Sequence, residues 1–205
     1  MTIWLATGNL HKKKELSDIL SDDILSIPWE LKIPQDAGID FDPEETGNTF
    51  FDNALIKASA LYEIIKEPVI ADDSGICVDA LNGRPGVYSA RYGGKGLSAA
   101  ERNALLLSEL EAIPETPVHG RKARFVCAMV LYYSPERFFI AQETFEGELV
   151  KNINEARGAG GFGYDPILFI PEMGRTVAEL TDAEKHRLSH RGKAARVIAK
   201  ILAGL

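Results

Sequence analysis

The segment from Ala123 to Tyr133, ARFVCAMVLYY, constrains the fold most, because apolar side chains occupy nearly every position. A strand with one face in water alternates apolar and polar residues, so a continuous apolar run is typical of a central strand covered on both faces. The turn residues SPE follow, and then a second strand-like run, RFFIAQETF. The pattern therefore predicts a β-hairpin at the centre of a sheet. The 205 residues are enough for one large domain with a substantial core.

Helices and shorter strands are predicted on both sides of this hairpin. Two capping-box patterns, Ser98 with Glu101 and Thr181 with Glu184, mark helix starts, and Ser189 can cap the last helix. Further strands are predicted at residues 3–6, 69–75 and 167–171. Helices are predicted to begin near residue 12, after Asn48 or Thr49, at 98 (ending near 112), and after residues 181 and 189. Residues 26–48 are predicted to be rich in loops. No internal repeat or low-complexity linker is present, and the order favours an α/β or α+β domain built on a mixed sheet.

The charge and the apolar runs exclude several classes of protein. The net charge of −7 disfavours a protein that coats DNA or RNA, although a small anionic substrate remains possible where basic residues gather. No apolar run reaches the ~18 residues of a membrane span, and the first residues do not resemble a signal peptide. Cys77 and Cys127 lie in apolar strand-like runs, which favours two buried thiols over a disulfide. We therefore expect a cytoplasmic protein with a small-molecule partner and no membrane or nucleic-acid polymer.

The stretch TGNLHK, Thr7 to Lys12, joins the first predicted strand to a helix. A helix N-terminus presents free N–H groups and the positive end of the helix dipole, and both favour a bound phosphate. Lys12 can reach the same anion. The alternative is a simple helix cap followed by a solvated basic run. The stretch is not a Walker A loop, because the glycine spacing and the Lys-Ser/Thr end are absent.

Asp72 and Asp73 follow an apolar run and precede Ser74 and Gly75, so we expect them at the end of a buried strand. Neighbouring strand residues point to opposite faces, so the two carboxylates cannot share one role if the strand is regular there. A carboxylate at a strand end is a common ligand for Mg²⁺, which takes one or two carboxylates together with phosphate oxygens and water. The alternative is an Asx-type turn leading into Gly75.

Three further charged residues surround the second predicted helix. Glu44 and Glu45 precede it, where they can favour the helix N-terminus or supply a second carboxylate to a metal. Lys57 is predicted on the side of this helix away from Phe51 and Leu55. A lysine in that position is more often solvated than functional.

The C-terminal part of the chain reverses the local sign of charge. Five lysines and arginines lie between residues 185 and 196, together with two histidines. His190 and Arg191 fall in the first turn of a predicted helix, where the dipole disfavours cations, so an anionic or acceptor-rich partner is indicated. The alternative is an exposed basic helix. Upstream, GGFGYDP places Phe162 and Tyr164 on a glycine-rich loop, where an aromatic ring can stack on a flat base or can simply belong to the core.

The stretches TGNLHK, EETGNTFFDNALIKA, ADDSG, GRPGVYSARYGG, GGFGYDPILF and ELTDAEKHRLSHRGKA occur in this order. Together they resemble the inosine triphosphate pyrophosphatase family, from residue 3 to about residue 196. The resemblance implies an elongated mixed β-sheet flanked by helices, an α/β fold with two lobes and a central cleft, formed by residues 1–205 as a single domain. It also implies a homodimer that uses Mg²⁺ to cut dITP, ITP and XTP between the α- and β-phosphates.

The resemblance implies roles for particular residues. Contacts to the triphosphate are implied at Thr7, Gly8, Asn9, Leu10, His11 and Lys12, and a further substrate contact is implied at Ser74. Contacts to the base are implied at Phe162, Gly163, Tyr164 and Asp165, and contacts to the edge of the base at Lys185, His190 and Arg191. The resemblance implies metal binding by Glu45 or its neighbour Glu44 and by Asp73, with Asp72 as the acidic neighbour. Asp73 is also implied as the base for the attacking water, with Lys12 and Lys57 facing the phosphates.

Two other functions are weighed against this expectation. One is a related pyrophosphatase that prefers dTTP and UTP, which the motifs disfavour. The other is a protein that binds inosine or xanthine nucleotides without cutting them, which would not need the acidic residues that activate water. Selectivity for hypoxanthine and xanthine is expected from their acceptor oxygen at position 6, where adenine has a donor amino group. Guanine shares that oxygen, so its 2-amino group must be what is rejected.

Overall fold

The computed structural model describes residues 1–20, 29–113 and 120–205. Its strands form one mixed sheet in the order β2-β1-β3-β4-β5-β6-β7, in which β1 runs parallel to β2 and β3 while β6 runs antiparallel to β5 and β7. The strands are β1 Thr2–Leu5, β2 Glu30–Lys32, β3 Val69–Val78, β4 Lys122–Ser134, β5 Arg137–Leu149, β6 Leu168–Ile170 and β7 Arg175–Thr176. The helices are α1 Leu10–Leu20, α2 Phe50–Ile65, α3 Ala99–Glu111, α4 Asp182–Leu188 and α5 His190–Ala203.

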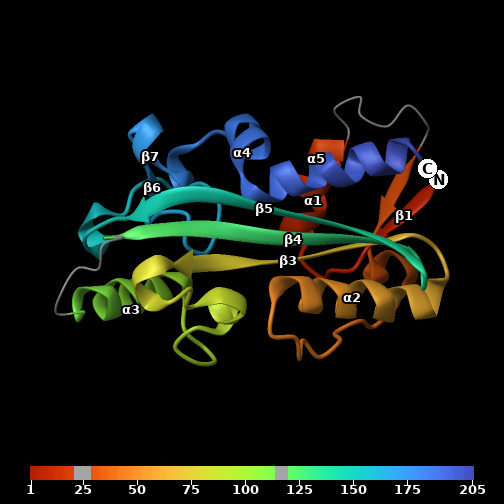
Figure 1. Ribbon diagram of the computed structural model, residues 1–205, viewed down its shortest axis with the longest axis horizontal. Helices are drawn as coiled ribbons and strands as arrows, with labels where there is room; N and C mark the ends of the chain where they lie inside the picture. The colour runs from red at the N-terminus through yellow and green to blue at the C-terminus, as the bar shows by residue number, and fades with distance from the viewer. Residues whose placement is uncertain (21–28, 114–119) are drawn as a thin grey trace. The chain divides into compact units, whose positions relative to one another are not determined.

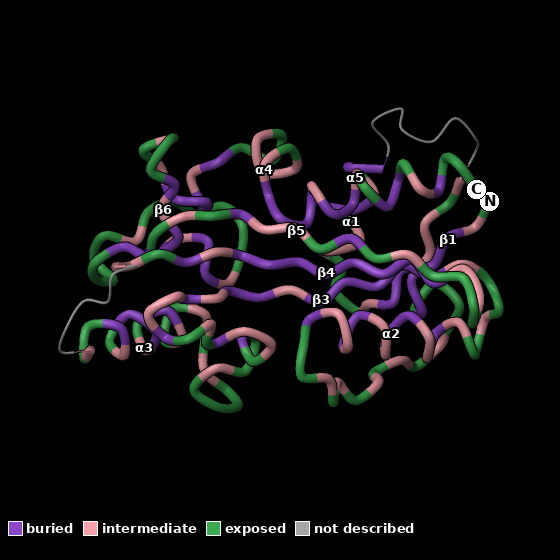
Figure 2. The backbone as a smooth tube through the Cα atoms, in the orientation of Figure 1, coloured by how far each residue is buried: buried purple, intermediate pink, exposed green. Residues whose placement is uncertain are grey.

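The hairpin predicted at the centre of the sheet is confirmed. β4 and β5 are neighbours in the sheet, and only Pro135 and Glu136 connect them. Residues 125–132 of β4 are all buried, as its continuous apolar run predicts, and Figure 2 shows β3 and β4 as mostly buried strands. β2 was not predicted: it is a three-residue strand within the segment predicted to be loops.

The chain divides into two compact units, and β3, β4 and β5 each contribute residues to both. The first unit contains residues 1–74, 127–143 and 189–205, and the second contains residues 75–126 and 144–188. In the first unit α2 covers one face of the sheet and α1 and α5 cover the other (Figure 1). Successive residues of a strand therefore enter different cores: Ile3 and Ile70 pack with α1 and α5, whereas Trp4 and Ala71 pack with α2.

The core of the second unit is formed by α3, the strands and the segment 164–180. Leu106, Leu107 and Leu110 of α3 pack with residues of β3, β4 and β5 such as Ile76, Phe125 and Phe145. The predicted capping boxes are present, because Ser98 accepts a hydrogen bond from the backbone of Glu101 and Thr181 accepts one from that of Glu184. Cys77 and Cys127 are free thiols, as expected; Cys127 is buried, whereas Cys77 is only partly buried. None of the helices in the described ranges has the length and apolar character needed to span a bilayer.

Gly75 of β3 lies in close contact with the segment Gly86–Arg91 of the same unit. A Cβ there would lie 2.4 Å from Ser89 Oγ and 2.6 Å from the Gly86 carbonyl oxygen. Ser89 Oγ accepts the Ile76 N–H at 2.9 Å and donates to Gly86 O at 2.6 Å, so the segment Gly86–Arg91 is fixed against the strand. Only glycine permits this approach, and the strand continues through it instead of ending there.

Gly75→Ala is expected to lower the free energy of unfolding by roughly 2 kcal/mol or more, because backbone and buried side-chain atoms must move to admit the methyl group. Ser89→Ala, which removes only the hydrogen bonds of the hydroxyl, is expected to cost about 1 kcal/mol. Denaturant unfolding of the two variants measures both effects. An equal or larger loss in Ser89→Ala would contradict the steric argument.

Candidate active site

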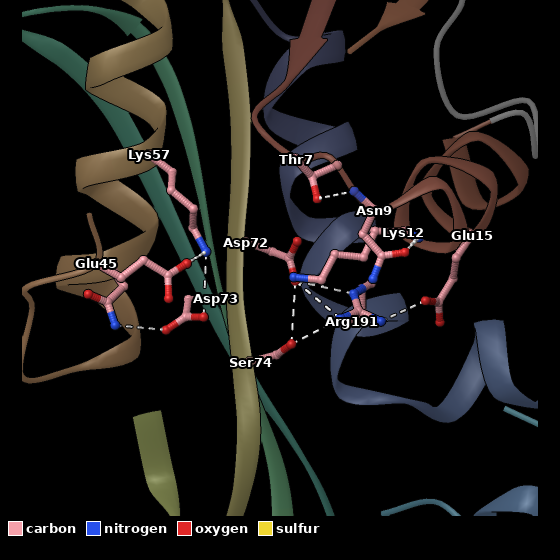
Figure 3. Close-up of polar contacts among 11 residues, drawn as sticks. Thr7, Asn9, Lys12, Glu15, Glu45, Lys57, Asp72, Asp73, Ser74 and Arg191 are labelled. Atoms are coloured by element: carbon pink, nitrogen blue, oxygen red, sulfur yellow. Dashed lines mark hydrogen bonds and ion pairs between the residues drawn. The ribbon is translucent and has the colours of Figure 1, made fainter. Parts of the chain in front are cut away.

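Asp72 and Asp73 lie in the middle of β3 and point to opposite faces of the sheet (Figure 3). The sequence analysis placed them at the end of a strand or in an Asx turn, and both placements are wrong, because the strand continues to Val78. The expected consequence of a regular strand does hold: the two carboxylates have separate partners. Asp72 meets residues of α1 and α5, and Asp73 meets residues of α2.

On the first face, Asp72 is held by two cations. Lys12 Nζ lies 2.9 Å from Asp72 Oδ2, and Arg191 donates to the same oxygen from Nε at 3.3 Å and from a terminal nitrogen at 3.2 Å. Arg191 also donates to Glu15 at 2.6 Å and to Ser74 Oγ at 2.9 Å. Because Arg191 and Asp72 are each only 3% exposed, this is a buried ionic network.

The charges in this network stabilise one another. Burial alone would raise the pKa of Asp72, but Lys12, Arg191 and Lys57 outweigh it and hold that pKa well below its usual range. Burial would likewise lower the pKa of Arg191, and Asp72 and Glu15 raise it instead. The alternative of an exposed basic helix is therefore wrong at this position: Arg191 is a core residue that pairs with carboxylates from β3 and α1.

On the second face, Asp73 is joined to Glu45 through Lys57. Lys57 Nζ lies 2.7 Å from Glu45 Oε1 and 3.5 Å from Asp73 Oδ1. The Asn53 amide donates to Asp73 Oδ2 at 3.1 Å and accepts the Gly47 N–H at 2.8 Å. Two carboxylates and one ammonium leave this group of side chains with one net negative charge, which favours a further cation.

The pKa values on this face shift in the direction that keeps Lys57 charged. Burial would lower the pKa of Lys57, but Asp73, Asp72 and Glu45 raise it above its ordinary value. Burial raises the pKa of Asp73; Lys57 and Asn53 counter this in part, and the net pKa is above that of a free aspartate. Asp73 is therefore a buried carboxylate with an increased affinity for a proton, as a general base requires.

The burial of Lys57 corrects the expectation of a solvated side chain. The buried face of α2 consists of Phe50, Asn53, Ala54, Lys57, Ala58 and Leu61, and Lys57 is only 9% exposed. Phe51 and Leu55, from which Lys57 was predicted to point away, are half-buried at the edge of this face. Thr49 caps this helix through a hydrogen bond from the Asp52 N–H, which fixes the start of the buried face.

Two polar residues of this centre were missed in the sequence. Asn53 lies four residues before Lys57 on the same helical face, so the helical spacing alone could have indicated it. Glu15 lies four residues before the buried Ile19, which is the comparable signal on α1. Glu44, the alternative to Glu45, is exposed. Among the described residues, no group of three or more His, Cys, Asp or Glu side chains is arranged to hold a metal.

The turn before α1 is exposed and its N–H groups are partly satisfied. Asn9 N–H donates to Thr7 Oγ1 at 3.1 Å, and Asn9 Oδ1 accepts the Lys12 N–H at 3.4 Å. Gly8, Asn9 and Leu10 are exposed, and Leu10 begins the helix. The strand–turn–helix arrangement predicted for the TGNLHK stretch is therefore present, while the side chain of His11 lies outside the described part of the structure.

In the second unit, the glycine-rich loop presents one exposed ring. Phe162 is 48% exposed, and Lys185 Nζ lies 5.0 Å from the centre of its ring. Asp165 accepts hydrogen bonds at 2.8 Å from both Lys185 Nζ and the Phe162 N–H. Tyr164 follows the alternative of a core aromatic: it is buried, burial raises its pKa to about 12, and its hydroxyl donates to Ser89 O.

The fold and these side chains define an α/β protein with a charged centre on each face of a central strand and, in the second unit, a loop phenylalanine beside a lysine of α4. The chain matches the Ham1 family over residues 3–201, and it belongs to that family. This confirms the resemblance found in the sequence motifs.

The relatives cover all or nearly all of the chain. A dITP/XTP pyrophosphatase of Treponema denticola is 49% identical over 208 residues, 100% of both chains. A HAM1 protein from Coxiella burnetii has a similar structure, with a TM-score of 0.89 at 37% identity and full coverage of both chains. The nucleoside-triphosphatase / dITP/XTP pyrophosphatase from Mycobacterium abscessus has a TM-score of 0.74 at 39% identity and covers 97% of this chain and 98% of its own.

Proposed function

We propose that this protein hydrolyses non-standard purine nucleoside triphosphates, among them dITP, ITP and XTP, to the nucleoside monophosphate and pyrophosphate. Such an activity keeps these bases out of DNA and RNA. The full-length relatives named dITP/XTP pyrophosphatase support the substrate class. The observation that carries the chemistry is the group formed by Glu45, Lys57 and Asp73, in which a basic carboxylate lies beside a buried ammonium.

The residues of the first unit fit the phosphate chain. The exposed turn at Thr7–Leu10 presents backbone N–H groups at the start of a helix, and helix N-termini favour anions. Lys12 and Lys57 supply two ammonium groups, each already oriented by a carboxylate of β3. A triphosphate carries about four negative charges, so fixed cations of this kind stabilise it most where its charge shifts during bond cleavage.

The donor set on the α2 face also fits Mg²⁺. Asp73 and Glu45 offer hard oxygen ligands, and their net negative charge with Lys57 leaves one charge to be balanced. Mg²⁺ characteristically binds one or two protein carboxylates and completes its shell with phosphate oxygens and water, so a larger cluster is not needed. When bound, the ion would neutralise charge on the phosphoryl oxygens. Asp72, on the opposite face, would hold Lys12 and Arg191 in place.

Asp73 is assigned as the general base for the attacking water. Its raised pKa lets it accept a proton, and Asn53 and Lys57 fix the orientation of its carboxylate. In the second unit, Phe162 would stack on the base, and Lys185 would donate to the acceptor oxygen at position 6. Adenine places a donor there, so its buried amino group would face a second donor, and a mismatch of this kind gives large selectivity.

The roles of His190 and Arg191 at the base edge stay predictions. His190 is buried in the first turn of α5, below the cap formed by Ser189. Arg191 already donates to Glu15, Asp72 and Ser74, so a base contact would require one of its N–H groups to serve the substrate in addition. We also propose that the protein acts in the cytoplasm and as a homodimer. Size-exclusion chromatography with light scattering would test the oligomeric state.

The substrate assignment is tested by pyrophosphate release at equal concentrations of ITP, XTP, GTP, ATP and dTTP, with and without Mg²⁺. Fast release that needs Mg²⁺ and is confined to ITP and XTP is the expected result. Equal release from every purine nucleotide would overturn the account of the base, and preference for dTTP would favour the pyrimidine-specific alternative. Tight binding of ITP without release would favour a nucleotide sensor.

A further inference from the structure

The loop that carries Phe162 is anchored by the helix α3. The Asn103 side-chain amide donates a hydrogen bond to the Gly163 carbonyl oxygen at 3.1 Å. Gly163 has a φ of +65°, a conformation that most residues avoid, and the loop turns there between Phe162 and the buried Tyr164. The Asn103 contact therefore acts at the residue where the exposed part of the loop meets the core.

Asn103 occupies a position that the core pattern would give to an apolar residue. It belongs to the buried stripe of α3 with Leu106, Leu107 and Leu110, at helical spacing, and it is only 4% exposed. Within the described residues its Oδ1 atom has no hydrogen-bond partner. A buried amide with one unpaired atom is unfavourable for stability, and an apolar side chain of similar size would complete the leucine stripe.

The side chains around Phe162 are those proposed to bind the base of the substrate. Asp165 accepts the Phe162 N–H and the Lys185 ammonium, and Lys185 lies over the Phe162 ring. The ring and the ammonium therefore depend on one short loop for their orientation. Tyr164 fixes that loop at a second point through its hydroxyl, which donates to Ser89 O at 2.8 Å.

We propose that Asn103 is a positioning residue for purine recognition: its amide holds the Gly163 carbonyl and thereby sets the direction of Phe162 and Lys185. This inference rests on the proposed function. It explains why a polar side chain interrupts the apolar stripe of α3, although a buried amide with an unpaired oxygen lowers the stability of the fold. Substitution of such a positioning residue should weaken binding of the base and leave binding of the phosphate chain unchanged.

The test is Asn103→Leu, assayed with ITP as substrate and with inorganic tripolyphosphate as a competitor that lacks a base. The KM for ITP is expected to rise about five- to tenfold, the effect of one lost hydrogen bond, with kcat within about twofold of wild type. The inhibition constant of tripolyphosphate should stay the same, and the midpoint of thermal unfolding should stay equal or rise. A merely structural residue would not produce this combination.

Two further variants serve as an alternative and as a control. Asn103→Ala removes the donor without adding volume, so the same KM effect is expected if Asn103→Leu does not fold. Ser108→Ala, on the same helix, removes only a hydrogen bond to the backbone of Leu105 and should leave both constants unchanged. An unchanged KM for ITP in either Asn103 variant, or an equal weakening of ITP and tripolyphosphate, would overturn the proposal. Failure of the wild-type protein to release pyrophosphate from ITP would instead overturn the proposed function.

Discussion

Asp73→Asn is expected to lower kcat for pyrophosphate release from ITP by roughly three to four orders of magnitude, because the proposed mechanism would lose both its general base and one ligand of the metal. The amide has nearly the same shape as the carboxylate, and its oxygen can still accept the hydrogen bond from Asn53. Folding should therefore be preserved, with a circular dichroism spectrum like that of the wild type and a similar affinity for ITP.

The matched control is Asp79→Asn, in which the lost carboxylate pairs with Arg124 at 2.6 Å in the second unit. It carries the same change of charge at a partly exposed ion pair, and its kcat is expected to stay within about twofold of wild type. Normal turnover by Asp73→Asn, or a comparable loss in Asp79→Asn, would refute the assignment of Asp73 as the base.

Arg191→Met is expected to lower the free energy of unfolding by about 3–5 kcal/mol. Methionine fills much of the same space, but the change removes the shared partner of two buried carboxylates, Glu15 and Asp72, and leaves their charge poorly compensated. For a chain of this length, each kcal/mol corresponds to about 2–4 °C in the unfolding midpoint. Denaturant unfolding at neutral pH measures the loss directly.

Lys200→Met provides the control, because Lys200 is an exposed residue of the same helix. It should change the free energy of unfolding by less than about 0.5 kcal/mol. A double-mutant cycle with Glu15→Gln should show coupling, since Glu15→Gln removes one of the charges that Arg191 leaves behind. Additive effects of the two substitutions, or a small effect of Arg191→Met alone, would mean that the ionic network does not stabilise the fold.

The elements that local patterns specify could be predicted from the sequence. The unbroken apolar run gives β4 its place inside the sheet, the two-residue connection makes the hairpin, and Ser98 and Thr181 cap their helices as expected. The β2 strand could not be predicted, because three residues of partly exposed backbone carry almost no periodic signal and form a strand only through pairing with β1.

The sequence indicated several charged residues of the polar centre but missed Asn53 and Glu15, and it indicated little of how these residues pair. Lys57 reads locally as a solvated lysine, and it is buried because Glu45 and Asp73 neutralise it from other parts of the chain. Gly75 reads as a strand breaker, and it lies within β3 because Ser89 approaches the strand there. In both positions a contact distant in the sequence outweighs the local preference, which no pattern within one segment can reveal.

The back-to-back aspartates also bear on how β3 finds its alignment. A slip by one residue would turn Asp73 toward Lys12 and Arg191 and Asp72 toward Lys57, so each carboxylate would still meet a cation. The pairing of charges alone would therefore hardly distinguish the two registers. Ile70 and Ala71 distinguish the two registers, because the slip would force the larger side chain against α2 and leave the small one to fill the core beside α1. The slip would also move Gly75 away from Ser89, where only glycine fits. The volume of uncharged neighbours therefore selects the alignment that places the charges correctly.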